Sequence, residues 1–291
     1  MRIGIDLGGT KIEGVSLDEN GRLIRRLRSD TPQGNYRKTL QAVADLAGQL
    51  DPNGKTPVGV GTPGAISPAS GLLRNSNSVC LNGQPLLQDL QEKLGRKVRL
   101  ANDADCFALS EARDGAATGA RSVFGVIIGT GTGGGIVVDG KPLAGPNAIA
   151  GEWGHNPLPW ATPDELPGPD CYCGKQGCIE TWLSGPGLAR DHGMGLTAQE
   201  IASAAATGEP LALQALQRYC DRMARALAGI INVLDPDVIV LGGGLSQIHS
   251  LYTEVPKRLP EYVFSDTMLT RLTPPRHGDS SGVRGAAWLW P

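Results

Sequence analysis

Short apolar runs alternate with helix-period segments along this chain, which predicts strands separated by helices. Four apolar runs are interrupted or followed by glycines, a pattern typical of buried strands that end in turns. They span residues 3–18, 58–67, 126–139 and 238–246. Helical periodicity marks three longer segments, residues 35–50, 103–117 and 211–234. In the first of these segments the apolar positions predict one buried face, formed by Tyr36, Leu40, Val43, Leu46 and Leu50.

The strand pattern occurs twice, which predicts two similar halves. Residues 3–18 suggest a strand, a glycine-rich turn and a second strand, and residues 126–139 repeat this plan. The short buried strand in residues 58–67 has its counterpart in residues 238–246. We therefore expect each half to be a mixed sheet covered by helices, with the boundary near Gly119.

Two other segments have a predictable structure. Residues 156–170 contain five prolines, which remove backbone donors and fix φ, so this segment is expected to be a loop. The closing segment, residues 281–290, is apolar with helix-compatible spacing, and we expect it to pack back on the first half.

Composition narrows the class of protein. With 40% hydrophobic residues and a net charge of -2, the chain of 291 residues has no basic excess for nucleic acid or an anionic membrane. Its first residues lack the features of a secretory signal. Six glycines interrupt the apolar stretch from Val123 to Val138, which predicts two strands and not a membrane span. A cytoplasmic protein with neither nucleic-acid nor membrane partners is expected.

The densest group of metal-ligating residue types consists of His155, Cys171, Cys173 and Cys178. Three thiolates and one imidazole are ligands that Zn²⁺ prefers in a closed, structural site. A disulfide plus a spare thiol is the alternative, but the odd number of clustered cysteines and the missing secretory segment argue against it. The zinc is expected to fix a loop that carries two carboxylates, Glu152 and Glu180.

The two glycine-rich turns are candidates for phosphate binding, because glycine lets backbone N–H groups approach an anion closely. Neither turn has the order of a Walker A loop, and neither leads from a strand into a helix as in a dinucleotide fold. A single glycine turn is usually only a hairpin. Two turns in matched positions, each with a threonine hydroxyl from Thr10 or Thr132, indicate a grip on one polyphosphate.

Six motifs together resemble the ROK family of sugar kinases. They are Asp6-Leu-Gly-Gly-Thr-Lys11, Leu100-Ala-Asn-Asp-Ala104, the turn from Gly129 to Gly135, Gly151-Glu-Trp-Gly-His155, Cys171-Tyr-Cys-Gly-Lys-Gln-Gly-Cys-Ile-Glu180 and Leu241-Gly-Gly-Gly-Leu-Ser246. The likeness runs from the first residues to His277–Ala287 and so covers essentially the whole chain. Residues 82–85 and 151–160 resemble the bacterial fructokinase, or manno(fructo)kinase, type within the family.

The resemblance implies an α/β protein with the actin-like ATPase fold, in which two similar ribonuclease-H-like lobes lie around a cleft. The N-terminal lobe would comprise residues 1–118 and 277–291, with the first phosphate loop and a catalytic aspartate. The C-terminal lobe would comprise residues 119–276, with the second phosphate loop, the zinc loop and the segment beside adenosine.

The resemblance also implies roles for individual residues. Asp103 matches the family's general base, although an aspartate at the start of a helix also serves as an N-cap. The sugar contacts would be Asn102, Asp103, Glu152, His155 and Glu180. His155 would donate to the sugar from the ring nitrogen that does not bind zinc. ATP would lie along both glycine turns and the adenosine segment, and its contacts would be Gly4, Asp6, Gly8, Gly9, Thr10, Lys11, Gly131, Thr132, Gly133, Gly134, Gly243 and Gly244. Among these, Asp6 would organise Mg²⁺ through water.

The expected activity is therefore ATP- and Mg²⁺-dependent phosphorylation of a hexose primary hydroxyl, with D-fructose as the substrate and fructose 6-phosphate as the product. A kinase for N-acetylglucosamine, N-acetylmannosamine or glucose is the alternative within the family, because these relatives share every motif above. A non-catalytic sugar-sensing or sugar-binding protein is the alternative from another class. The sequence disfavours it, because the chain starts with a phosphate loop instead of a helix-turn-helix and retains Asp103. Family members are often dimers, so the resemblance allows a homodimer, although no apolar stripe in the sequence marks an interface.

Overall fold

The structure, a computed structural model, describes residues 1–291, which divide into two compact units. The first unit comprises Met1–Gly119, Gly135–Ala150 and Arg276–Pro291, and the second comprises Ala120–Gly134 and Gly151–Pro275. The sequence-based division kept residues 135–150 with the second lobe. They belong to the first unit here because the backbone of Gly135 lies directly against that of Ala104, so that a Cβ on Gly135 would come within 2.4 Å of the Ala104 carbonyl oxygen.

Strands of the first unit form a five-stranded mixed sheet in the order β3-β2-β1-β4-β7. Their bounds are β1 Arg2–Leu7, β2 Lys11–Leu17, β3 Leu23–Asp30, β4 Val58–Thr62 and β7 Val98–Asn102. The first three strands are antiparallel neighbours, whereas β1, β4 and β7 run parallel. A small hairpin consists of β5 Ala65–Ile66 and β6 Leu73–Arg74. The helices of this unit are α1 Tyr36–Leu50, α2 Leu86–Leu94, α3 Asp103–Arg113 and α9 Ser281–Trp288.

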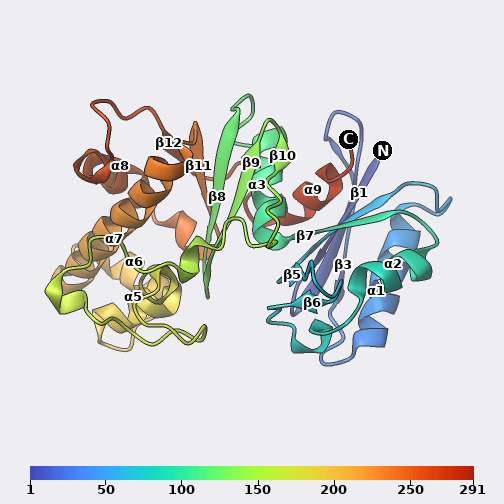
Figure 1. The fold of residues 1–291 in the computed structure, drawn as a ribbon, viewed down its shortest axis with the longest axis horizontal. Helices are drawn as coiled ribbons and strands as arrows, with labels where there is room; N and C mark the ends of the chain where they lie inside the picture. Colours follow the sequence, from blue (N-terminus) through green and yellow to red (C-terminus); the bar gives the residue numbers. More distant parts are fainter. The chain divides into compact units, whose positions relative to one another are not determined.

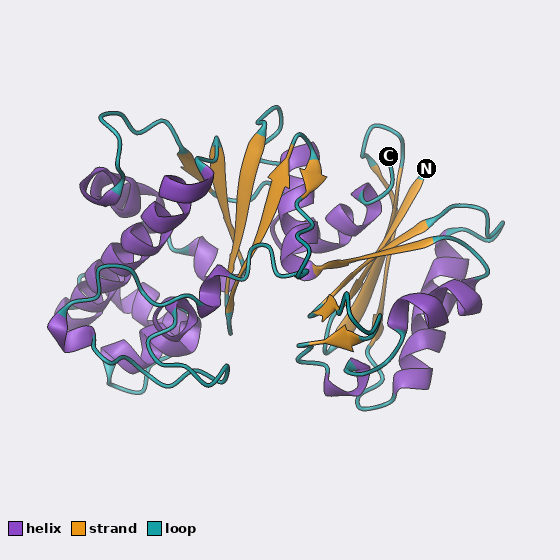
Figure 2. Ribbon diagram, viewed as in Figure 1, coloured by secondary structure: helices purple, strands orange, loops and turns teal.

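The second sheet repeats the plan of the first, in the order β10-β9-β8-β11-β12 (Figures 1 and 2). Its strands are β8 Ser122–Ile128, β9 Thr132–Val138, β10 Lys141–Pro142, β11 Val238–Gly242 and β12 Arg271–Thr273. The helices of the second unit are α4 Ile179–Leu183, α5 Gly185–His192, α6 Ala198–Ala206, α7 Pro210–Leu234 and α8 Leu251–Tyr262. Single 3₁₀ turns are η1 Val79–Leu81, η2 Trp153–His155, η3 Pro163–Glu165, η4 Gly244–Gln247 and η5 Gly278–Ser280. The predicted duplication is thus confirmed at the level of strand order.

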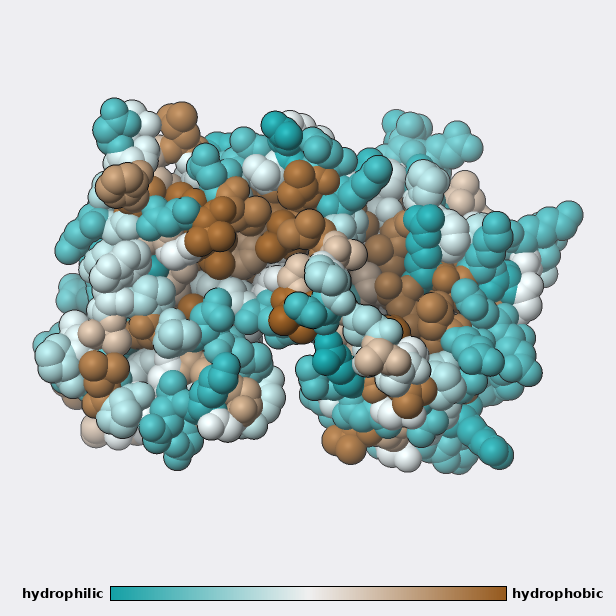
Figure 3. Space-filling model, viewed as in Figure 1, coloured by the Kyte–Doolittle hydropathy of each residue, from teal (hydrophilic) through white to brown (hydrophobic).

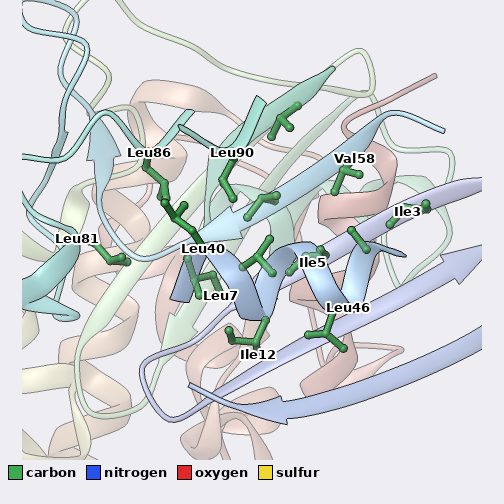
Figure 4. Close-up of a cluster of buried hydrophobic side chains, with 14 of the residues drawn as sticks. Ile3, Ile5, Leu7, Ile12, Leu40, Leu46, Val58, Leu81, Leu86 and Leu90 are labelled. Atoms are coloured by element: carbon green, nitrogen blue, oxygen red, sulfur yellow. The ribbon is translucent and has the colours of Figure 1, made fainter. Parts of the chain in front are cut away.

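The apolar alternation of β1 decides what lies on each face of the first sheet. Ile3, Ile5 and Leu7 point into a core made with α1 and α2, which Figure 4 shows in close-up. The predicted face of α1 lies in the same core, since Leu40, Val43, Leu46 and Leu50 are buried and Tyr36 packs against them. On the opposite face, Gly4 and Asp6 point toward α9.

Helix α3 ends at Arg113, four residues before its predicted limit. Beyond Arg113, the side chain of Glu111 accepts a backbone N–H that a longer helix would bond to a main-chain carbonyl. The fully buried carboxylate of Glu111 accepts the N–H of Ala116 at 2.7 Å and the hydroxyl of Ser281 at 2.7 Å. It also accepts the N–H of Arg276 at 3.0 Å. Neutral donors thus satisfy this buried carboxylate and tie one distant segment, which contains Arg276 and Ser281, to the end of α3.

The face of the protein drawn in Figure 3 is polar over much of its area and carries several contiguous apolar patches. The stretch Val123–Val138 forms strands β8 and β9, as its glycines predict. None of the helices combines the length and the apolar character that a membrane crossing requires.

Helix α9 packs on the first sheet at positions where only glycine fits, which confirms that the closing segment returns to the first half (Figure 1). A Cβ on Gly4 would come within 2.2 Å of the Val283 carbonyl oxygen, and one on Gly59 within 1.7 Å of the Ala286 carbonyl oxygen. A Cβ on Gly285 would in turn meet the Cys106 carbonyl oxygen at 1.6 Å. Backbone lies on backbone along this seam, so no side chain can move aside to make room.

We expect Gly59→Ala to lower the free energy of unfolding by about 1–3 kcal/mol, because the added methyl group must push α9 away from β4. Urea denaturation measures this change. The matched control is Gly48→Ala on the exposed surface of α1, where nothing lies within 4 Å of the added Cβ. The control should gain about 0.5–1 kcal/mol from helix propensity. Equal free energies of unfolding for the two variants would contradict the close backbone contact between α9 and β4.

Candidate functional site

Two aspartates lie at the carboxyl ends of parallel strands in the first unit. Asp6 is near the end of β1, and Asp103 directly follows β7 and begins α3. Burial, the charge of Asp103 and the charge of Glu13 raise the pKa of Asp6 to about 6, although Lys11 opposes them. A Cβ on Gly282 would come within 3.4 Å of an Asp6 carboxylate oxygen, so α9 covers this side chain closely. The arrangement gathers negative charge at one sheet edge, where a cation would be stabilised.

Asn102, not Asp103, occupies the N-cap position of α3. Its side-chain oxygen accepts the N–H of Ala104 at 2.8 Å, and its amide nitrogen donates to the carbonyl of Gly64 at 3.1 Å. Asp103 also accepts the Ala104 N–H, at 2.8 Å, but its side chain is exposed. The cap is therefore provided mainly by Asn102, whose side-chain oxygen and nitrogen both already have protein partners.

The first glycine turn joins β1 to β2 and is held from outside. The Gly8 carbonyl accepts the hydroxyl of Thr31 at 2.7 Å, and the Gly9 carbonyl accepts the side-chain amide of Gln33 at 2.5 Å. Gly9, Thr10 and Lys11 are exposed at the tip of the turn. Gly4, in contrast, is buried beneath α9, so the structure explains this glycine by packing and not by contact with a phosphate.

The second glycine turn joins β8 to β9 in the second unit. Thr132 is 6% exposed, and its hydroxyl has no hydrogen-bond partner. The Thr132 N–H donates to a carboxylate oxygen of Glu180 at 2.8 Å. A threonine with a buried, unpaired hydroxyl is a donor that a bound anion can satisfy.

The four predicted metal-ligating side chains come together. One ligand atom from each of His155, Cys171, Cys173 and Cys178 lies within 4.8 Å of all the others. The sulfurs of Cys173 and Cys178 are 3.6 Å apart, close to the ~3.8 Å edge of a tetrahedral zinc–thiolate site. All six cysteines of the chain are free thiols, so the alternative of a disulfide is not realised.

The ring nitrogens of His155 have separate partners. Nδ1 lies 3.6 Å from the sulfur of Cys171, on the side of the cluster, and Nε2 lies 2.9 Å from the hydroxyl of Tyr172. The nitrogen predicted to donate to a sugar is therefore paired with a tyrosine in this structure. Tyr172 was not singled out in the sequence, although it stands between two of the cysteines.

The proline-rich segment is a loop, as predicted, apart from the single turn η3. A buried cluster of charged side chains attaches this loop to helix α7. Glu165 accepts hydrogen bonds from Arg222 at 2.7 Å and from two nitrogens of Arg225 at 2.8 Å each. All three residues are at least 95% buried. Burial raises the pKa of Glu165, but the hydrogen bonds from Arg225 and Arg222 outweigh it and lower the pKa to about 2.

The segment after β11 turns sharply at Gly243, which has a φ of +81°. A Cβ there would come within 2.3 Å of the Ile128 carbonyl oxygen, so close packing alone requires this glycine. Beyond it lies a cavity of about 500 Å³ between α6, α7 and the start of α8, which sequence patterns could not locate. Its lining includes Ala202, Ala206, Leu213, Leu216, Gln247 and Ile248.

Comparison with known proteins places these features in a family context. The family model described as the ROK family matches residues 2–291. N-acetyl-D-glucosamine kinase from Yersinia pseudotuberculosis is 41% identical over 299 aligned positions, which cover 99% of this chain and 98% of the relative. The crystal structure of a ROK hexokinase from Thermus thermophilus is 30% identical, with a TM-score of 0.87 over 99% of this chain and 96% of that one.

A third match carries ligands. The crystal structure of a ROK family glucokinase from Streptomyces griseus in complex with glucose and AMPPNP is 26% identical. Its TM-score is 0.78, and the match covers 99% of this chain and 98% of that one. The predicted actin-like ATPase fold with two lobes is confirmed by these structural neighbours.

We expect the buried Glu165 cluster to make stability depend on pH. Because the pKa of Glu165 is below its ordinary value in the folded state, the cluster stabilises the protein above about pH 4.5 and loses this contribution as the pH falls toward 2. At neutral pH, Glu165→Gln should lower the free energy of unfolding by on the order of 3 kcal/mol. Its deficit should shrink steadily as the pH falls through this window.

Urea denaturation of both proteins at several pH values measures the deficit. Glu92→Gln, at an exposed position of α2, is the control and should match the parent throughout. A deficit for Glu165→Gln that is the same at pH 3 and at pH 7 would contradict the assigned charge cluster.

Proposed function

Because the chain belongs to the ROK family, we propose that it is an ATP- and Mg²⁺-dependent kinase that phosphorylates N-acetyl-D-glucosamine on its primary hydroxyl. The observation that carries this proposal is the 41% identity to an N-acetyl-D-glucosamine kinase over nearly the full length of both chains. The glucokinase relative that holds glucose and AMPPNP supports a sugar and a nucleoside triphosphate as the two ligands.

The expectation of fructose is wrong. The full-length relatives at about 40% identity are N-acetyl-D-glucosamine kinases, which overturns the assignment to the fructokinase type. That assignment used residues 82–85 and 151–160. These segments hold turns and loop anchors in the structure, such as the bond from the Ser76 N–H to the Asn82 side chain and from the Trp153 indole to the Gly133 carbonyl. Scaffold positions such as Asn82 and Trp153 are compatible with more than one hexose.

In this proposal Asp103 is the general base. Its exposed carboxylate orients the sugar hydroxyl and takes its proton as the hydroxyl oxygen bonds to the γ-phosphorus and ADP leaves. Alignment contributes more than basicity, because the transition state of phosphoryl transfer is loose. Asp6, beside Asp103, would hold Mg²⁺ through water, and the ion would supply positive charge that neutralises the phosphates.

The remaining proposed roles fall to the second unit. Thr132 and the glycines around it receive nucleotide phosphate, and the cavity beyond Gly243 takes the adenine ring. Glu152, His155 and Glu180 contact the sugar. The cluster of one histidine and three cysteines fits a structural zinc in the spacing of its ligand atoms and in the chemistry of its donors. Zinc would fix the segments that carry the two glutamates.

The first test is ATP turnover with Mg²⁺ across N-acetylglucosamine, N-acetylmannosamine, glucose, mannose and fructose. We expect the highest kcat/KM for N-acetylglucosamine. Asp103→Asn should fold and still bind sugar, because the amide oxygen can accept from the same hydroxyl, but lose about 10²–10⁴-fold in kcat. A preference for another sugar would refute the assignment of N-acetylglucosamine as the substrate. If folded, zinc-loaded protein phosphorylates none of these sugars, the proposed kinase activity is refuted.

The second test concerns the metal. We expect the parent protein to purify with a stoichiometric amount of zinc and Cys173→Ser to lose zinc and unfold at a lower temperature, because one ligand is gone. Cys80→Ser removes a thiol outside the cluster and should retain the zinc. Elemental analysis and thermal unfolding provide the measurements. Full zinc content in Cys173→Ser would exclude Cys173 as a ligand.

A further inference from the structure

A carboxylate occupies the second glycine turn at the point where an anion would bind. One oxygen of Glu180 accepts the Thr132 N–H at 2.8 Å. A Cβ on the preceding residue, Gly131, would come within 2.6 Å of the same oxygen. The missing side chain at Gly131 is therefore what allows Glu180 to reach the backbone of the turn.

Thr132 presents two donors to this place, and only one of them has a partner. Its N–H is bound by Glu180, whereas its hydroxyl is buried without a hydrogen bond. A carboxylate oxygen satisfies the amide alone. A phosphate group carries three or more oxygens and can accept from both donors, so the turn suits phosphate better than it suits its present occupant.

The rest of the turn is fixed by main-chain and indole contacts. The Gly129 carbonyl accepts the N–H of Gly185 at 2.7 Å, and the Gly133 carbonyl accepts the indole N–H of Trp153 at 3.0 Å. Trp153 is 2% exposed and packs edge-on against Phe124, so its indole is held in place. The bond to Glu180, in contrast, is made by a carboxylate side chain, which can change its rotamer without moving the backbone.

We propose that Glu180 is a gate on the phosphate loop which the sugar substrate opens, an inference that rests on the proposed function. Without sugar, the Glu180 carboxylate holds the Thr132 N–H and repels nucleotide phosphate. Sugar hydroxyls attract the carboxylate away, and the N–H and hydroxyl of Thr132 then both bind phosphate. By linkage, sugar and nucleotide strengthen each other's binding by the same factor.

The experiment measures the Kd of AMPPNP with Mg²⁺ by titration calorimetry, with and without saturating N-acetylglucosamine. In the parent protein, we expect the sugar to tighten AMPPNP binding about 10-fold. Glu180→Gln keeps the shape and one oxygen that can accept the Thr132 N–H but removes the charge. Without sugar it should bind AMPPNP several-fold more tightly than the parent, and the effect of sugar should fall to about twofold or less.

Glu152→Gln is the matched control, because it removes the other proposed sugar carboxylate, which has no hydrogen bond to the turn. It should weaken sugar binding and leave AMPPNP binding without sugar unchanged. The gate is refuted if saturating sugar does not change AMPPNP affinity in the parent protein, a result that needs no variant. It is also refuted if Glu180→Gln and Glu152→Gln bind AMPPNP equally without sugar.

These outcomes are separate from the failure of the proposed function. If N-acetylglucosamine is phosphorylated but does not alter AMPPNP affinity, the function stands and the gate falls. If calorimetry detects no binding of N-acetylglucosamine at all, the substrate assignment falls first. The gate is then refuted for that sugar as well.

Discussion

Direct contact between backbones at glycine is the constraint on which both units depend. In the first unit, helix α9 reaches the sheet only because Gly4 and Gly59 have no side chains. In the second unit, a Cβ on Gly154 would come within 2.1 Å of the Thr132 carbonyl oxygen, so the segment with Trp153 seats directly on the second glycine turn. Polar groups near these contacts are therefore positioned by the main chain, which adjusts less than packed side chains do.

Buried charge and the buried side chain of Leu158 together secure the proline-rich loop. Trp160 and Leu166 of this loop are more than half exposed, while Glu165 is buried between two arginines of α7. Buried charges are stable only when fully paired, so the loop has one arrangement in which its carboxylate is satisfied. The same loop leads into the cluster of three cysteines and a histidine, which then holds the start of α4 and with it Glu180.

The strands, the buried face of α1 and the grouping of the four metal-ligating residues could be predicted, because each depends on residue type at a regular or short spacing. The partners of individual polar groups could not. Asn102 rather than Asp103 provides the main helix cap, and Tyr172 pairs with the ring nitrogen of His155. Gly4 serves packing, since its neighbours Val283 and Ala287 lie 279 and 283 residues away in sequence, in α9. The preferred sugar depends on such long-range contacts, and for that reason the motifs did not identify it.

The placement of α9 has a consequence for biosynthesis. The first sheet consists of strands that leave the ribosome early, yet one of its faces is covered by residues 281–288. Until those residues emerge, Gly4, Gly59 and the side of Asp6 that faces α9 stay open to water and to other nascent chains. The unit that is translated first is thus completed last. In a chain that ends before α9, the N-terminal unit would stay incompletely folded, although the missing residues belong to the C-terminus.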